Sequence, residues 1–440
     1  MLKRKVYDSL LRWKANRGKE CLLIKGARQI GKTYLVEQFG KNEYESFIEI
    51  NFLRQPELKT IFAGDLSSEN IYKRISAFIP NIKLVEGKTL IFLDEIQKCA
   101  NASTALKFLA EDRRFDVIAS GSLLGLHYGQ DADVEVEEVS SIPVGYERQI
   151  TMYSLDFEEF LWAYGYDAEA IDYIKGFFDR KEKVPFEINE KFENLVKEYI
   201  VVGGMPEVVV EFMKNKDFNA VQQTQDKILL DYMDDIASHA KGAEKIKVKA
   251  CYDSIPRQLA RENKKFKYSE VEKKSTARKY EDSVQWLCDS NLVYICYNVT
   301  EPYLPLMANE KENEFKIYVN DTGLLCAMYG FNTKLAVLNG TLKGNAKGGI
   351  YENLIAEMLI KNGYTLHYYK KSDSTLEIEF LIEKNAEVLP VEVKAGNTQS
   401  ASLNNFIQEN KPDIAYKLID GNVGFTDSKF TLPHYMALFI

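Results

Sequence analysis

A phosphate-binding loop near the amino terminus constrains the fold more than any other feature. Residues 26–33 read GARQIGKT, a full match to the pattern GxxxxGK[ST]. The apolar run CLLI precedes the loop, and the apolar-periodic segment YLVEQF follows it. This order of strand, loop and helix is required because the amides of the loop and of the helix start must converge on phosphate oxygens. The segment therefore predicts an α/β domain that binds a nucleoside triphosphate.

The motif assigns a role to each of its residues. Lys32 is expected to reach the β- and γ-phosphates of ATP, and the Thr33 hydroxyl is expected to bind Mg²⁺. The backbone of the remaining residues is expected to wrap around the phosphates: Gly26, Ala27, Arg28, Gln29, Ile30 and Gly31.

An acidic strand end completes the predicted nucleotide site. In KTLIFLDEIQ, residues 88–97, an apolar run is followed by Asp94 and Glu95. Asp94 is expected to hold the Mg²⁺ shell through water, and Glu95 is expected to orient and deprotonate the attacking water. The second role is typical of a hydrolytic enzyme rather than a kinase, so the acidic pair predicts ATP hydrolysis.

Two more polar features are candidates for contact with the γ-phosphate. The apolar run 115–119 is followed by Ser120, Gly121 and Ser122, at the edge where ligands gather in an open α/β sheet. Ser122 is the first choice for a catalytic sensor and Ser120 the second, with capping of the following turn as the alternative. Arg148 could act as an arginine finger, in cis or from a neighbouring subunit, or could be an ordinary surface or ion-paired arginine.

The middle of the chain has the periodicity of helices. Residues 156–239 contain several helical segments, with a break at the run GGMP, residues 203–206. These helices are expected either to form a bundle that packs on the ATPase core or to act as a lid that moves with the nucleotide state. The two interpretations are compatible.

Residues 241–280 are strongly basic in a chain whose net charge is −8. The segment holds 13 Lys and Arg against 5 Asp and Glu. Residues 265–299, which overlap this segment, have the order of short strand, turn, helix and β-ribbon that is typical of a winged helix. Residues 276–287 would then be the recognition helix, and four cations would face DNA phosphates: Lys273, Lys274, Arg278 and Lys279. A solvated basic face on a packing module remains the alternative.

The last part of the chain begins with a segment whose composition predicts a linker. Residues 341–350, TLKGNAKGGI, are rich in Gly and Lys. A helix that contains Glu352 follows, and after it come two strands, 375–382 and 387–394, joined by a short turn.

Charged residues recur on these strands with a period of two. Glu377 and Glu379 share one strand face, and Glu392 and Lys394 share a face of the next strand. Together with Glu352 they are the ingredients of a metal-dependent phosphodiesterase, in which acids bind Mg²⁺ and the lysine steadies the attacking water. A half-buried hairpin with a charged outer face is the alternative.

Composition narrows the class of protein further. At 440 residues the chain is long enough for two to four domains, and its 45% hydrophobic content excludes general disorder. Six scattered cysteines without a CxxC pair favour buried reduced thiols, and the four separated histidines show no metal-ligand spacing. No apolar stretch approaches the ~18 residues that span a bilayer, and the basic amino terminus lacks the apolar core of a signal peptide. A cytoplasmic location without membrane insertion is expected.

Taken together, these segments resemble a bacterial and archaeal family of single-chain AAA+ type ATPases, known as ATP-binding proteins, with a carboxyl-terminal DUF4143 region. The resemblance covers nearly the whole chain and is carried by GARQIGKT, LIFLDEIQ, SGSLLG, LDFEEFLW, VGGMPEVV, ARKYEDSVQWL, KIYVNDTGLL and EVKAG. It implies a multidomain α/β protein with a parallel-sheet P-loop ATPase core (1–160), a helical lid (161–240), a winged-helix-like domain (241–338) and a domain similar to the PD-(D/E)XK nuclease fold (339–440).

The resemblance also implies roles for individual residues. Lys32, Thr33, Asp94 and Glu95 match the nucleotide site, and four others match the nuclease-like pattern: Glu352, Glu379, Glu392 and Lys394. One departure concerns Glu379, because the pattern usually has Asp there. The extra methylene moves the carboxylate by about an ångström, which can cost ~100-fold in a tuned site.

The predicted function is Mg²⁺-dependent ATP hydrolysis coupled to movement of a DNA-contacting or regulatory tail. Two alternatives remain open from the sequence. One is an ATP-gated, metal-dependent nuclease, and the other is a non-catalytic nucleotide switch that docks a protein partner. Assembly of the chain into a homo-oligomer is also left open.

Overall fold

The computed structural model describes residues 2–16, 20–121, 146–239, 243–371, 376–396 and 400–440. These residues form two compact units. The first unit comprises residues 3–153 with 289–291, and the second comprises most of the chain from Ser154 onward. Each unit has its own sheet.

The first unit is built on five parallel strands in the order β2-β3-β4-β1-β5. The residues of β1 and β3 are buried throughout, because helices cover both faces of a parallel sheet. The strands are β1 (Cys21–Lys25), β2 (Ser46–Asn51), β3 (Thr89–Asp94), β4 (Asp116–Gly121) and β5 (Glu147–Thr151). The predicted parallel α/β core is confirmed.

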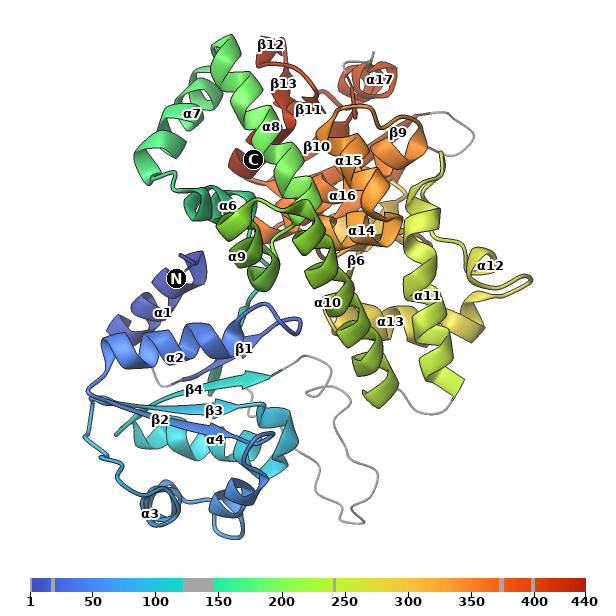
Figure 1. Cartoon of the computed structure of the whole chain (residues 1–440). Coiled ribbons are helices and arrows are strands. Elements are labelled where there is room, and N and C mark those ends of the chain that lie inside the picture. Colours follow the sequence, from blue (N-terminus) through green and yellow to red (C-terminus); the bar gives the residue numbers. More distant parts are fainter. Residues whose placement is uncertain (1, 17–19, 122–145, 240–242, 372–375, 397–399) are drawn as a thin grey trace. The chain divides into compact units, whose positions relative to one another are not determined.

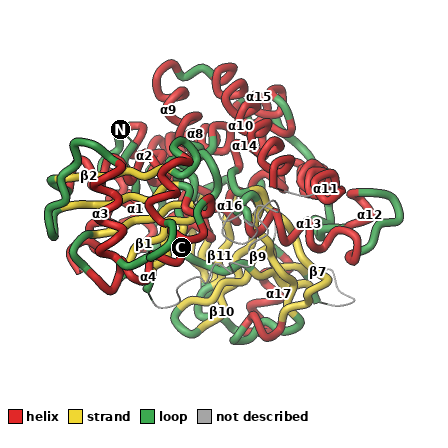
Figure 2. Tube along the Cα trace, turned by 90° about the horizontal axis from the view of Figure 1, so that it is seen from below, coloured by secondary structure: helices red, strands yellow, loops and turns green. Residues whose placement is uncertain are grey.

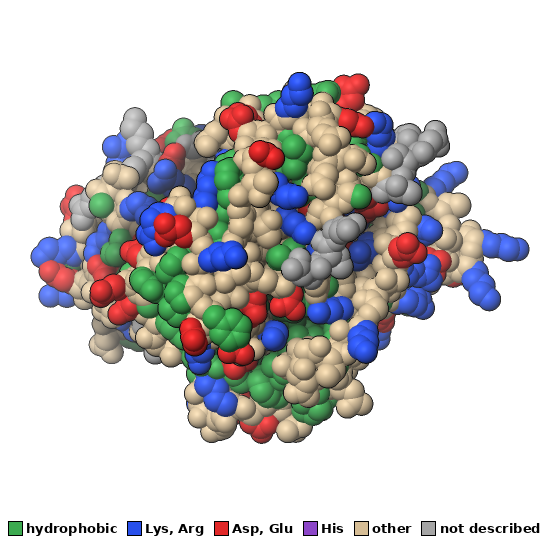
Figure 3. All heavy atoms as spheres, turned by 90° about the horizontal axis from the view of Figure 1, so that it is seen from above, with side chains coloured by type: hydrophobic (Ala, Val, Ile, Leu, Met, Phe, Trp, Pro, Cys, Tyr) green, Lys and Arg blue, Asp and Glu red, His purple; other side chains and the backbone are tan. Residues whose placement is uncertain are grey.

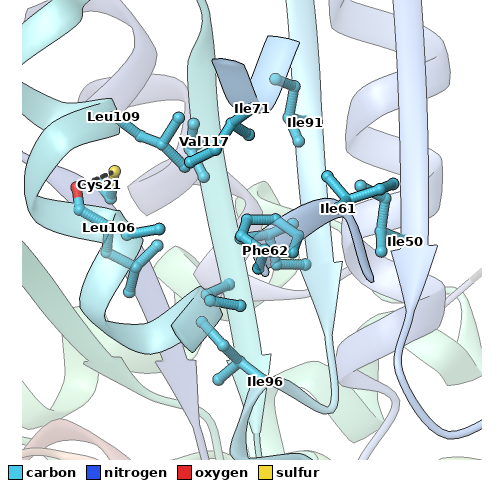
Figure 4. Close-up of a cluster of buried hydrophobic side chains, with 14 of the residues drawn as sticks. Cys21, Ile50, Ile61, Phe62, Ile71, Ile91, Ile96, Leu106, Leu109 and Val117 are labelled. Carbon is cyan, nitrogen blue, oxygen red and sulfur yellow. Dashed lines mark hydrogen bonds between the residues drawn. The ribbon is translucent and has the colours of Figure 1, made fainter. Parts of the chain in front are cut away.

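Helix α2 lies on one face of this sheet, and helices α3 and α4 lie on the other (Figure 1). Figure 4 shows the core on the second face, where side chains of neighbouring strands, such as Ile50, Ile91 and Val117, meet Phe62 and Leu106. The helices of this unit are α1 (Lys5–Asn16), α2 (Lys32–Glu43), α3 (Ser68–Phe78) and α4 (Ala100–Asp112), with two short 3₁₀ helices, Pro56–Phe62 and Ile96–Lys98.

The second unit begins with the helices that the sequence predicts. They are α6 (Phe157–Tyr164), α7 (Ala168–Arg180), α8 (Phe186–Val202), α9 (Pro206–Asn215) and α10 (Phe218–His239). The predicted break lies between α8 and α9. Gly204 is required there, because a Cβ atom on it would lie 2.0 Å from the carbonyl oxygen of Leu155.

Seven further α-helices lie in the described part of this unit, together with two short 3₁₀ helices, Leu306–Asn309 and His434–Phe439. The α-helices are α11 (Ala243–Leu259), α12 (Tyr268–Val271), α13 (Ala277–Asp289), α14 (Thr322–Tyr329), α15 (Phe331–Leu338), α16 (Asn345–Lys361) and α17 (Ala401–Asn410). The helix predicted over residues 276–287 is present as α13, and its role in DNA recognition stays a prediction. No described helix is both long and apolar enough to cross a membrane.

The sheet of the second unit has eight strands in the order β12-β13-β11-β10-β9-β8-β6-β7. They are β6 (Val293–Val299), β7 (Glu310–Val319), β8 (His367–Lys370), β9 (Glu377–Lys384), β10 (Glu387–Val393), β11 (Ala415–Ile419), β12 (Gly424–Thr426) and β13 (Lys429–Pro433). In Figure 2 the strands β7, β9, β10 and β11 lie together, with α16 and α17 beside them.

This sheet joins strands that the sequence assigned to different modules. The predicted β-ribbon is present as the antiparallel pair β6–β7, but β6 also pairs in parallel with β8. The two strands predicted after Glu352 are β9 and β10, which pair antiparallel around a short turn. The division into four domains, at residues 160, 240 and 338, stays a prediction.

The predicted linker at 341–350 is wrong for its second half. Asn345 begins α16, so residues 345–350 are helical. Gly349 lies against the backbone of α11, where an added Cβ atom would come within 2.3 Å of the carbonyl oxygen of Leu259. Its glycine therefore serves close helix packing, which composition alone does not distinguish from linker flexibility.

Candidate functional site

The phosphate-binding loop connects β1 to the first residue of α2, Lys32. Gly26 has φ +150° and lies so close to the chain after β5 that a Cβ atom would be 2.2 Å from the carbonyl oxygen of Met152. Gly31 caps α2 in the left-handed region, with φ 87°. The loop thus delivers the amides of a helix amino terminus to its hollow, which is the backbone arrangement that binds phosphate.

The Lys32 side chain lies back against the loop residues that precede it. Its side chain is buried, and its Nζ donates to the carbonyl oxygens of Gly26 at 3.0 Å and Ala27 at 2.7 Å. An ammonium group in this position is within reach of an anion bound by the same loop.

Asp94, at the end of β3, is the centre of a polar cluster. One carboxylate oxygen, Oδ2, accepts from Thr33 Oγ1 at 3.0 Å and from Asn51 Nδ2 at 2.7 Å. The other, Oδ1, accepts from the hydroxyl of Ser120 at the end of β4. The carboxyl ends of three adjacent strands and the start of α2 therefore converge at one carboxylate.

Asn51 is a candidate site residue that the sequence analysis missed. Its side chain is buried, and its Oδ1 accepts from the amides of Leu53 at 3.1 Å and Arg54 at 2.8 Å. These bonds fix the amide so that Nδ2 faces Asp94. The only available signal was a polar residue at the end of the apolar alternation SFIEIN, and its partner lies on a neighbouring strand.

Glu95 leaves β3 with φ 56°, in the left-handed region that costs energy for a side chain other than glycine. The residue is half-buried, and Gln97 Nε2 donates to its Oε2 at 2.6 Å. This hydrogen bond from Gln97 holds the Glu95 carboxylate. The role of Glu95 as a base toward water stays a prediction.

The remaining candidates of this unit have different outcomes. Ser122 lies outside the described residues, so its predicted role is untested, whereas Ser120 contacts Asp94. Arg148 is exposed and pairs in register with Leu22 of β1, while Thr151 pairs with Lys25 at the start of the loop. Three residues of strand separate Arg148 from that edge, about 10 Å. The structure does not bring Arg148 to the phosphate loop.

The residues of this site fit ATP with Mg²⁺. Thr33 and Asp94 present neighbouring oxygen atoms, the donor type that Mg²⁺ prefers, and the metal keeps its other positions for water and phosphate. Lys32 and the start of α2 supply positive charge and amide donors for the phosphates.

The residues of the predicted phosphodiesterase site lie in the second unit, where the three glutamates pair with lysines. Glu352 Oε1 accepts from Lys316 at 2.9 Å and from Tyr318 at 2.6 Å, and its Oε2 lies 3.0 Å from Lys264. Lys394 lies 3.1 Å from both Glu379 and Glu392.

Glu377 joins the same network. Its two oxygens lie 2.9 Å from Lys316 and from Lys370. The four carboxylates of the network, Glu352, Glu377, Glu379 and Glu392, thus have four lysine partners, Lys264, Lys316, Lys370 and Lys394.

The pKa values follow from this pairing. Burial alone would raise the pKa of Glu352, but Lys264 and Lys316 lower it to about 2. Burial alone would lower the pKa of Lys316, yet Glu352 and Glu377 raise it well above its usual value. Glu352 and Lys316 are therefore held in their charged forms, whereas burial raises the pKa of Glu379.

The network contains four carboxylates and four lysines, and both oxygens of the buried Glu392 lack a hydrogen-bond partner among the described residues. Over the ranges that the structure describes, no group of three or more His, Cys, Asp or Glu side chains is arranged to hold a metal. The structure brings Glu379, Glu392 and Lys394 together as predicted but directs Glu352 to Lys316 and Lys264. The observed contacts support an ion-pair network, and nuclease activity stays an untested alternative.

Comparison with known families agrees with the resemblance noted in the sequence. Residues 18–161 match the family model described as AAA domain. Residues 193–335 and 347–433 match two domains of unknown function, DUF8612 and DUF4143. The predicted AAA and DUF4143 regions are confirmed, and similarity of the carboxyl-terminal part to PD-(D/E)XK nucleases stays a prediction.

Among solved structures, the Walker-type ATPase of Pyrococcus abyssi is similar at 14% identity, with 75% of this chain and 96% of that chain covered and a TM-score of 0.44. DnaA of Aquifex aeolicus bound to AMPPCP is similar at 13% identity, with 65% and 88% covered and a TM-score of 0.29. No curated protein matches the sequence.

Proposed function

We propose that this chain binds ATP with Mg²⁺ and hydrolyses it at the loop Gly26–Thr33. One observation carries the proposal. The loop, the Thr33 hydroxyl and the Asp94 carboxylate meet at the carboxyl edge of a parallel sheet, with Thr33 Oγ1 3.0 Å from Asp94 Oδ2. Glu95, the next residue, supplies a carboxylate beside them.

Each residue has a separate role in the proposed reaction. The amides at the start of α2 and the Lys32 ammonium group bind the β- and γ-phosphates and offset their charge. Glu95 orients a water molecule and accepts its proton as the water attacks the γ-phosphorus, while the bond from this phosphorus to the bridging oxygen breaks and ADP leaves. Asn51 and Ser120 act on Asp94, because their hydrogen bonds fix its carboxylate.

Thr33 and Asp94 would hold Mg²⁺ at this site. When bound, the ion would neutralise phosphate charge and orient the phosphate oxygens.

The proposal predicts nucleotide binding and phosphate release that both depend on a divalent cation. Titration of ATP with Mg²⁺ into the full chain is expected to give a saturable calorimetric signal. Phosphate release is expected to fall to background when EDTA removes the metal, since the triphosphate charge is then offset only by protein groups. A folded protein that gives no heat with ATP and Mg²⁺ and releases no phosphate would contradict the proposal.

A second proposed function is contact with DNA through the basic turn between α12 and α13. Lys273, Lys274 and Arg278 are exposed, and none of them forms an ion pair with an acid in the described part of the chain. Lys279, by contrast, is paired with Glu272. Figure 3 shows basic side chains projecting at its right edge, the side on which α12 lies in Figure 1. Unpaired cations on a protruding turn are suited to contact phosphates.

This proposal predicts salt-dependent binding of a DNA duplex. The triple variant Lys273→Gln, Lys274→Gln, Arg278→Gln is expected to weaken binding. It is also expected to make the negative slope of log affinity against log salt shallower, by about 1 for each phosphate that the variant no longer neutralises. Fluorescence anisotropy of a labelled duplex between 50 and 200 mM salt, roughly the range over which such binding weakens, measures both quantities.

The matched control replaces three lysines on other helices, Lys175, Lys214 and Lys227, each of which has an acidic partner. Equal affinity and equal slope for the wild type and the basic-turn variant would exclude the DNA contact. Coupling of hydrolysis to movement of the second unit stays a prediction, as do the nucleotide-switch alternative and assembly into a homo-oligomer.

A further inference from the structure

Arg4 is a buried arginine of the first unit that no motif predicts. It directly precedes α1, and only 7% of its surface is exposed. Its Nη1 donates to the carbonyl oxygen of Ile30 at 3.1 Å, and its Nη2 donates to the carbonyl oxygen of Tyr153 at 2.6 Å. The guanidinium group thus joins the middle of the phosphate loop to the chain just after β5.

The same stretch of chain touches the start of the loop. The Met152 amide donates to the carbonyl oxygen of Lys25 at 2.7 Å, and the Met152 carbonyl excludes any side chain at position 26. The loop is therefore fixed at Lys25–Gly26 by Met152 and at Ile30 by Arg4. The attachment at Ile30 is formed by Arg4, which is far from the loop in sequence. The charge of Arg4 makes its hydrogen bond to Ile30 stronger than one between neutral groups.

The bond to Ile30 determines how one peptide group is turned. The Ile30–Gly31 peptide is trans, so its carbonyl and its N–H point in opposite directions. A carbonyl held toward Arg4 leaves the Gly31 N–H pointing away from Arg4, to the other side of the loop. Gly31 has φ 87° and caps α2, so its amide belongs to the set that a phosphate-binding loop offers to an anion.

We propose that Arg4 is a positioning residue of the nucleotide site, which holds the Ile30–Gly31 peptide in the orientation that binds phosphate. The inference rests on the proposed function, since it assigns a role toward the nucleotide. Arg4 does not contact the phosphates itself. It organises the loop before the nucleotide arrives, which lowers the ordering cost of binding.

The variant Arg4→Gln tests this role by removing the charge and the forked pair of donors that serves both carbonyls. The Kd for ADP and the KM for ATP are expected to rise about tenfold, while kcat changes by less than about threefold, because the amide binds phosphate in the ground state and the transition state alike. A purely structural role would instead lower the melting temperature and the active fraction, so that kcat falls while KM stays unchanged.

Arg12→Gln is the matched control, since Arg12 lies exposed on α1 and contacts only Ser9 among the hydrogen bonds described. Arg4→Lys retains the charge and can serve one carbonyl at a time, so an intermediate Kd is expected. Wild-type affinity in a folded Arg4→Gln variant would overturn the inference, and so would loss of the fold in both Arg4 variants. Failure of the wild type to bind ATP or ADP would instead overturn the proposed function.

Discussion

Replacing Lys32 with alanine is expected to reduce ATP turnover by at least ~100-fold and to weaken ATP binding. The ammonium group lies inside the loop, bonded to the carbonyls of Gly26 and Ala27, and its removal takes away the positive charge nearest to the bound phosphates. Phosphate release and calorimetric titration of ATP measure the two effects separately.

Glu95→Gln provides a contrast at the same site. Glutamine keeps the size and the hydrogen-bonding capacity of the side chain but cannot accept a proton, so turnover is expected to fall ~100-fold or more while ATP affinity stays close to that of the wild type. Lys41→Ala is the matched control, because Lys41 is exposed on the same helix as Lys32, α2, and pairs with Glu37. Similar turnover in the wild type and in both site variants would contradict the assignment of the site.

Replacing Lys316 with methionine is expected to destabilise the second unit by about 3–5 kcal/mol at neutral pH. Lys316 is 1% exposed and lies 2.9 Å from both Glu352 and Glu377. Methionine fills a similar volume but leaves the buried carboxylate of Glu352 and the half-buried carboxylate of Glu377 with one partner fewer. Chemical denaturation followed by circular dichroism measures the change.

The sign of the pH dependence follows from the same contacts. In the wild type, the pKa of Glu352 is about 2, so its ion pairs stabilise the fold above the unfolded pKa of about 4.5 and lose that effect as pH falls toward 2. In Lys316→Met, Glu352 keeps Lys264 but loses Lys316, so its pKa is expected to rise, and protonation then removes the charge that lost this partner. The difference in stability between variant and wild type is therefore expected to shrink between neutral pH and about pH 4.

Lys311→Met on the same strand, β7, is the control for this variant. Lys311 is more exposed and lies 3.9 Å from Glu314, so its loss is expected to change stability by less than about 1 kcal/mol. Equal effects of the two substitutions would mean that the network around Lys316 does not contribute as proposed.

The candidate nucleotide site could be predicted from the sequence where its residues are consecutive in the chain. The loop 26–33 and the pair Asp94–Glu95 are contiguous motifs, because a strand end must deliver them together. Asn51 escaped prediction because its role depends on β2 lying next to β3, an adjacency that no local pattern records. Arg4 was missed for the same reason, since Ile30 is 26 residues away and Tyr153 is 149 residues away.

The charged residues of the second unit show how much the two-residue alternation of a β-strand can predict about side-chain contacts. It placed Glu377 with Glu379 and Glu392 with Lys394, and in the structure the pairing of the two strands brings Glu379 within 3.1 Å of Lys394. It could not identify Lys316 and Lys264 as the partners of Glu352. These lysines reach it through the packing of α16 against β7 and the chain beyond α11, so their separation in sequence conceals the contact.

The parallel pairing of β6 with β8 also limits where this polypeptide can be divided. A fragment that starts near residue 340 would retain β8 but lose β6. In the intact chain, Tyr297, Asn298 and Val299 of β6 pair with β8. The backbone groups of residues 367–369 would then form an open sheet edge, a ready template for intermolecular pairing. Self-association of such a truncated piece would reflect the cut itself and not a property of the intact protein.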